Sequence, residues 1–132
     1  MPFTTESVVF ISHFDVKPGH LHAFQALWDT VAIELERQKP RTAAYLAFQN
    51  EGGGTLTIVH VFPDANAFAT HVTGADDRSR QAYEHIVPAG WEVYGAAPED
   101  IVAQLGESAL AAGVDLTIQP RQLGGFLRTI VG

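Results

Sequence analysis

The sequence predicts an α+β domain in which helices cover one face of an antiparallel sheet. Segments rich in β-branched residues alternate with segments of helical period, in the order β-α-β-β-α. A short glycine-rich turn joins two of the expected strands. One more strand would complete the ferredoxin-like pattern βαββαβ. A chain of 132 residues can bury a core of its own, so we expect a single domain over residues 1–132.

Residues 7–16 form the first expected strand, because valine, isoleucine and phenylalanine dominate them. Pro18 and Gly19 then interrupt the extended run. After this break the apolar residues recur at three- and four-residue spacing, which is typical of an amphipathic helix that ends before Pro40. The apolar residues of this helix are Leu21, Phe24, Trp28, Val31 and Leu35.

Residues 43–49 and 55–62 are the second and third expected strands. The glycines at 52–54 between them can adopt positive φ angles, so we expect an antiparallel hairpin. Asp64 is a favourable N-cap for a short helix after the hairpin, and Gly74 ends that helix.

The last third of the chain is less regular. Helices are expected over residues 76–87, before Pro88, and from Pro98 to Gly113. The alternating residues 114–119 are the candidate for the missing fourth strand. Two further extended pieces are expected, a short one at residues 91–94 and a last one at residues 126–131.

The first and third strands are apolar on both faces. In the third strand, Ile58 and Phe62 lie on one face, and Val59 and Val61 lie on the other. Because the helices can cover only one face of the sheet, something else must cover the second face. The C-terminal helices could wrap around it, but a second copy of the chain is the simpler cover. The sequence therefore predicts a homodimer.

Composition excludes several classes of function. A net charge of −7 argues against nucleic acid as a partner. The absence of cysteine excludes thiolate catalysis and thiolate metal sites. No run approaches the roughly 20 apolar residues of a membrane span, and the N-terminus does not have the pattern of a signal peptide. We expect a cytoplasmic protein with no membrane partner.

Two stretches resemble domains of the antibiotic-biosynthesis-monooxygenase superfamily. Residues 8–28, with Val16-Lys17-Pro18-Gly19-His20, resemble its opening strand, turn and first helix. Residues 45–71, which end in Phe68-Ala69-Thr70-His71, resemble its hairpin and second helix. The resemblance implies a dimeric α+β barrel with a small pocket between sheet and helices in each subunit. Members oxidise aromatic polyketides or quinols without metal or flavin, degrade haem, or have roles that are not defined.

Three positions depart from the pattern of that superfamily. Phe62 stands where many members, including the haem-degrading ones, have tryptophan. His60 stands where glutamate is common, and His13 where arginine or asparagine is often found. These differences argue against haem degradation.

Three of the six histidines, His13, His60 and His71, are expected among apolar residues. If they converge on one cavity, they form a polar cluster typical of a binding site. Strand parity leaves open whether His13 and His60 lie on the same face of the sheet. Each could instead be a buried histidine that only makes hydrogen bonds. The remaining histidines are expected to be structural or incidental: His20, His22 and His85.

The function expected first is a cofactor-independent monooxygenase, or a related small-molecule enzyme, that acts on an aromatic or quinol-like substrate. Its catalytic base would be His71 or His60, since the ordinary imidazole pKa of about 6.5 is close to the working pH. Two alternatives remain: a non-catalytic dimeric module that binds a small hydrophobic ligand, and a metal or haem protein that uses the three histidines. The residues expected to bind the substrate are His13, Trp28, Tyr45, Phe62 and Phe68.

Overall fold

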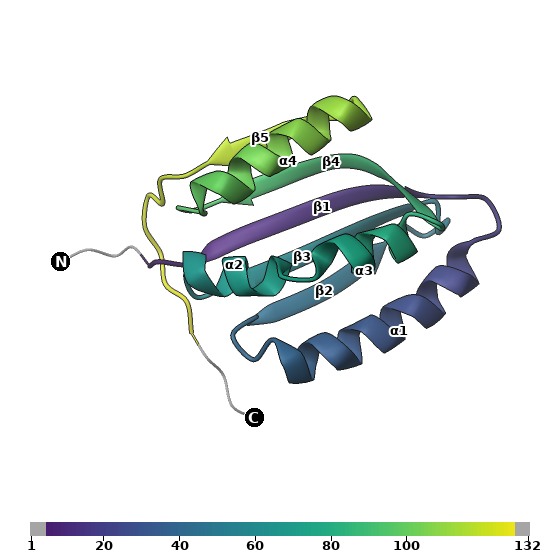
Figure 1. The fold of residues 1–132 in the computed structure, drawn as a ribbon, viewed down its shortest axis with the longest axis horizontal. Helices are drawn as coiled ribbons and strands as arrows, with labels where there is room; N and C mark the ends of the chain where they lie inside the picture. Colours follow the sequence, from purple (N-terminus) through teal and green to yellow (C-terminus); the bar gives the residue numbers. More distant parts are fainter. Residues whose placement is uncertain (1–4, 129–132) are drawn as a thin grey trace.

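The computed structural model describes residues 5–128. Its sheet has five strands in the order β2-β3-β1-β4-β5 (Figure 1). The strands are β1 (Val8–Val16), β2 (Ala44–Gln49), β3 (Thr55–Phe62), β4 (Ile86–Tyr94) and β5 (Leu116–Gln119). The helices are α1 (Leu21–Gln38), α2 (Ala65–Val72), α3 (Ala75–Ala82) and α4 (Glu99–Ala112). The pairs β2–β3, β3–β1 and β1–β4 are antiparallel, so the predicted α+β, ferredoxin-like fold class is confirmed.

The fourth strand of the ferredoxin-like unit is β4, and the prediction that residues 114–119 supply it is wrong. β4 pairs with β1 from Val9 opposite Tyr94 to Val16 opposite Ile86. Residues 116–119 of the predicted segment form the edge strand β5, which runs parallel to β4. Residues 126–128 have no regular structure, and residues 129–131 lie outside the described part of the chain.

The helix predicted over residues 76–87 ends at Ala82, because the chain beyond it joins the sheet. Pro88 suggested a helix end, yet it lies inside β4. The register between β1 and β4 shifts next to Phe14, which is paired with Pro88, and β5 pairs with β4 only from Trp91 onward. A proline is tolerated at such an irregular position because no second neighbouring strand needs its missing N–H.

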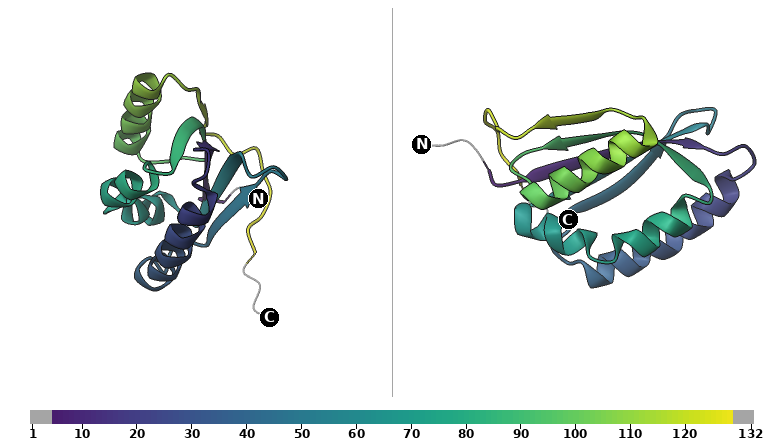
Figure 2. Two further views of the ribbon diagram at one scale, coloured as in Figure 1. Left: turned by 90° about the vertical axis from the view of Figure 1, so that its right-hand side faces the viewer. Right: turned by 45° about the horizontal axis from the view of Figure 1, so that its top comes forward.

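All four helices lie on one face of the sheet, as the two views in Figure 2 show. Along β3, Leu56, Ile58, His60 and Phe62 are buried beneath these helices, whereas the alternate residues point to the open face. The predicted cap of α2 is also present, since the Asp64 carboxylate accepts a hydrogen bond from the Ala67 N–H at 2.8 Å. No helix within residues 5–128 is long and apolar enough to cross a membrane.

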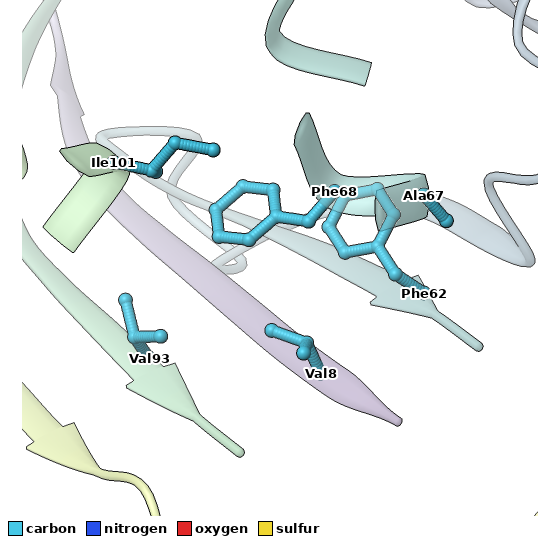
Figure 3. Packing of buried hydrophobic residues seen from close by; sticks show 6 residues of the cluster. All are labelled: Val8, Phe62, Ala67, Phe68, Val93 and Ile101. Atoms are coloured by element: carbon cyan, nitrogen blue, oxygen red, sulfur yellow. The ribbon is translucent and has the colours of Figure 1, made fainter. Parts of the chain in front are cut away.

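One part of the core lies where α2 and α4 meet the sheet (Figure 3). Phe62 of β3 and Phe68 of α2 are fully buried there, with their rings stacked at a centroid distance of 4.8 Å. Val8, Val93 and Ile101 complete the packing from β1, β4 and α4. Because α4 contributes to this core, it belongs to the helical layer and does not wrap around the open face.

Replacing Phe68 by alanine should lower the free energy of unfolding by about 3–5 kcal/mol, because a fully buried aromatic ring is removed and leaves a cavity. Phe126→Ala is the matched control, since that ring is 76% exposed. Urea denaturation of both variants measures the difference. Equal losses of stability in the two variants would contradict the assignment of Phe68 to the core.

Candidate functional site

A cavity of about 520 Å³ lies between the helical layer and the sheet. β1, β3 and β4 form its floor, and residues of all four helices form its walls. A volume of this size is in the range of small-molecule sites, which are mostly apolar with a few polar groups. The aromatic residues that line the cavity are Phe10, Phe14, Phe24, Trp28, Tyr45, Tyr83 and Trp91.

His60 of β3 presents a hydrogen-bond acceptor to this cavity. Its Nδ1 lies 3.1 Å from the carbonyl oxygen of Phe10. A carbonyl can only accept, so Nδ1 carries the proton and Nε2 keeps its lone pair in the neutral ring. Nε2 has no hydrogen-bond partner within residues 5–128. Every fully buried side-chain nitrogen in this part of the chain does have a partner, so Nε2 is not fully buried. It therefore borders open volume, and the cavity is the space that the ring lines.

His71 of α2 lies beside His60. The two rings meet edge to face with centroids 5.2 Å apart. Nδ1 of His71 is 2.7 Å from the Thr42 hydroxyl, which holds the ring in place. Tyr45 of β2 packs against both imidazoles and stacks on Trp28 of α1 at 4.4 Å. These four rings form one continuous side of the cavity.

Burial determines the charge state of this cluster. It is the main reason why the pKa of His60 is lowered to about 4 and that of His71 to about 3, and the cationic side chain of Arg78 contributes to both shifts. Burial also raises the pKa of the Tyr45 hydroxyl to about 12. At neutral pH the cluster therefore consists of two uncharged imidazoles and an uncharged phenol. They can accept and donate hydrogen bonds without any charge of their own.

Four of the residues predicted for the site do line the cavity: Trp28, Tyr45, His60 and His71. Phe62 and Phe68 do not line it, although we expected them to bind substrate. Both are fully buried in the core cluster with Val8 and Val93. Phe62 lies on the same face of the sheet as the cavity, but its ring packs against Phe68 of α2 within this cluster.

His13 lies on the opposite face of the sheet from the cavity. It is paired with Thr57 in the ladder, out of phase with the pair formed by Phe10 and His60. Its ring contacts the Thr57 hydroxyl at 3.1 Å and the Glu92 carboxylate on the open face. The three-histidine site therefore does not form. Within residues 5–128 no group of three histidine, aspartate or glutamate side chains is arranged to hold a metal ion.

Arg78 is the cavity residue that the sequence did not reveal. It belongs to α3, whose sequence Ala-Asp-Asp-Arg-Ser-Arg-Gln-Ala is typical of a solvated helix. Nothing in that pattern distinguishes Arg78 from Arg80. The structure does, since Arg78 lines the cavity and Arg80 is exposed.

Comparison with known proteins shows similarity in fold. No protein-family model matches the sequence, and no curated protein is significantly similar to it. The structure is similar to MupZ from Pseudomonas fluorescens, with a TM-score of 0.69 and 18% identity over 96% of this chain and 99% of that chain. It is also similar to SnoaB, a cofactor-independent oxygenase from Streptomyces nogalater, with a TM-score of 0.59 and 17% identity over 70% and 95% of the two chains.

A candidate antibiotic biosynthesis monooxygenase from Caulobacter crescentus gives a TM-score of 0.60 and 11% identity, over 69% of this chain and 90% of that chain. Identities this low establish the fold alone. At that level they agree with the resemblance stated for the sequence: the chain shares its fold with MupZ, SnoaB and the Caulobacter protein.

The free energy of unfolding should decrease as the pH is lowered from 6.5 toward about 4. In that range the unfolded chain protonates the imidazole of His60 and the folded protein does not, so protons favour unfolding. His60→Gln should reduce this pH dependence by about 1–3 kcal/mol, because each unit of pKa difference corresponds to about 1.4 kcal/mol. Urea denaturation at several pH values measures it. The same slope in the variant and the unchanged protein would show that His60 is not held neutral.

Proposed function

We propose that this protein is a cofactor-independent monooxygenase that acts on an aromatic or quinol-like small molecule in the cavity. The observation that carries the proposal is the unpartnered Nε2 acceptor of neutral His60, which lies within an aromatic cavity of about 520 Å³. The shared fold with SnoaB, described as a cofactor-independent oxygenase, adds support.

In this chemistry the substrate supplies the electrons. An acidic phenol or activated methylene gives up a proton, and the resulting electron-rich anion reacts with molecular oxygen. When a methylene becomes a carbonyl, one oxygen atom forms the new C=O bond. The other oxygen leaves as water with the two methylene hydrogens. Atoms and electrons balance without an external reductant, so the task of the protein is to bind the substrate, accept the proton and exclude water.

The side chains of the cavity suit these tasks. Nε2 of His60 is the proton acceptor, and His71 lies next to it. The Tyr45 hydroxyl stays protonated because its pKa is raised to about 12, so it can donate a hydrogen bond to the oxygen on which negative charge develops. An imidazole with a pKa of about 4 is a weak base. A substrate anion beside the ring would raise that pKa, because opposite charges stabilise each other.

The weakness of the same bases favours a second candidate, a non-catalytic module that binds a small hydrophobic ligand. Two imidazoles with pKa values near 3 and 4 can serve as neutral hydrogen-bond acceptors for a ligand hydroxyl. This candidate requires saturable binding without oxygen consumption.

Oxygen uptake with an anthrone or hydroquinone substrate distinguishes the two candidates. His60→Gln should lower kcat by about 100-fold or more, which is the usual contribution of a general base. His71→Ala should also lower it, whereas the exposed His22→Ala should have no effect. Unchanged turnover in His60→Gln would remove this residue from the mechanism. Binding without any uptake in the unchanged protein would favour the non-catalytic module.

We also propose that the open face of the sheet is covered by a second copy of the chain. Val9, Ile11, Val59 and Val61 lie on this face in the two central strands. Leu46 of β2 continues the apolar surface and is 49% exposed. The C-terminal helix α4 packs on the other face, so it does not provide the cover. An apolar surface over several strands favours a protein partner.

The segment after β5 supports a dimer as well. It has no regular structure from Pro120 to Arg128. Leu123 is fully exposed and Phe126 is largely exposed, so neither packs on its own domain. A partner subunit would give both side chains apolar surface to cover.

Leu46→Glu should convert the dimer to a monomer, because a carboxylate buried without a partner in the interface is costly. Leu110→Glu introduces the same change on α4, where the side chain is 86% exposed, and should leave the dimer intact. Sedimentation equilibrium measures the mass of each. A monomeric unchanged protein, or a dimeric Leu46→Glu variant, would contradict this interface.

A further inference from the structure

Arg78 is a cation on the wall of the cavity that has no acidic partner. Its side chain is half-buried, and it lines the cavity together with His60, His71 and Tyr45. The ion pairs within residues 5–128 join His13 to Glu92, Arg41 to Asp64, and Arg80 to Asp77. Asp76 also borders the cavity, but it is exposed and forms no ion pair with Arg78.

The hydrogen bonds of Arg78 leave part of its guanidinium unused. One terminal nitrogen donates to the His71 carbonyl oxygen at 2.7 Å, and the other donates to the Thr73 carbonyl oxygen at 3.4 Å. These contacts cap the C-terminal end of α2 and hold the side chain in place. They use two of the five N–H groups that an arginine carries. The other three have no acceptor among residues 5–128.

The cap alone does not require a second cation. Nζ of Lys39 already donates to the Thr70 and Thr73 carbonyl oxygens at the same end of α2, at 2.8 and 3.2 Å. The neighbouring Tyr45 hydroxyl stays protonated and the two imidazoles are neutral, so none of these groups supplies a negative charge beside Arg78. Although the net charge of the chain is −7, the cationic side chain of Arg78 lies on the wall of this largely aromatic cavity.

We infer that the ligand of this cavity carries an anionic oxygen, and that Arg78 binds it. This inference rests on the proposed function only in taking the cavity as the ligand site. A carboxylate or phenolate would supply the missing counter-charge and accept the free N–H groups. Trp28, Tyr45 and Trp91 would surround its apolar body. Arg78 then selects acidic aromatic compounds over neutral ones of the same shape.

Calorimetric titration with two compounds of nearly equal shape tests the inference, namely naphthalene carboxylate and its neutral carboxamide at neutral pH. The unchanged protein should bind the carboxylate more tightly. Arg78→Gln should weaken carboxylate binding by about 10- to 100-fold, the usual range for a hydrogen bond to a charged group. Carboxamide binding should change by less than about twofold, because a neutral group gains little from the cation.

Arg80→Gln is the matched control, because it removes the same charge from the same helix at an exposed position. Carboxylate binding should stay unchanged in it. Arg78→Lys should recover part of the carboxylate affinity, because it restores the positive charge. If weak binding in Arg78→Gln came only from loss of the α2 cap, the charge of lysine alone would not restore it. Thermal denaturation of each variant reports whether the α2 cap is lost.

Equal weakening of both compounds by Arg78→Gln, or no weakening of either, would overturn the inference. An equal effect of Arg80→Gln would overturn it too, since general electrostatic attraction would then suffice. If neither compound binds the unchanged protein, the inference is overturned, and oxygen uptake with an anthrone or hydroquinone still tests the proposed function separately. If the carboxylate binds through Arg78 and oxygen uptake is absent, the inference stands and the monooxygenase proposal falls.

Discussion

The register between β1 and β3 is the constraint on which the rest of the structure depends. It places Phe10 directly opposite His60, and the carbonyl oxygen of Phe10 then receives the Nδ1 proton of that imidazole. A backbone contact set by strand pairing therefore fixes both the position and the tautomer of the buried ring. A shift of one residue would turn His60 to the open face and bring Val59 or Val61 under the helices.

The same alternation divides the polar groups of the central strands into two sets with different environments. Beneath the helices, His60 is desolvated and neutral, and it has an unused acceptor. On the open face, His13 contacts Glu92, which also accepts a hydrogen bond from the Tyr94 hydroxyl. That network is internally paired, and the hydrogen bonds to Tyr94 and His13 lower the pKa of Glu92. Unsatisfied polar capacity is what a ligand site offers, so the cavity side, and not the open face, has the character of a binding site.

Sequence patterns predicted what depends on local chemistry and missed what depends on topology. The first three strands, α1 and α2 follow from hydrophobic period, the glycine turn and the Asp64 cap. The fourth strand was misplaced because Pro88 suggested a helix end, and only the register shift beside Phe14 explains how the sheet accepts it. In the site, His60 could be predicted from its apolar neighbours, and His71 from the resemblance carried by Phe68-Ala69-Thr70-His71. The side chain of His13 lies on the face of the sheet opposite the helices, so His13 is not part of the site. Arg78 could not be predicted, because only the fold brings α3 to the cavity.

Helix α4 bears both on the shape of the cavity and on the extent of the structural comparisons. Ile101 and Leu105 of α4 line the cavity and also pack against the core beside Phe68. The likeness to MupZ extends over 96% of this chain, and so includes most of α4 and β5, whereas the likeness to SnoaB extends over 70%. The remaining 30% is comparable in size to the stretch after β4. Because α4 forms part of the cavity wall and the likeness to SnoaB extends over only 70% of this chain, the size and shape of the ligand have to be argued from the residues that line this cavity, such as Ile101, Leu105 and Arg78.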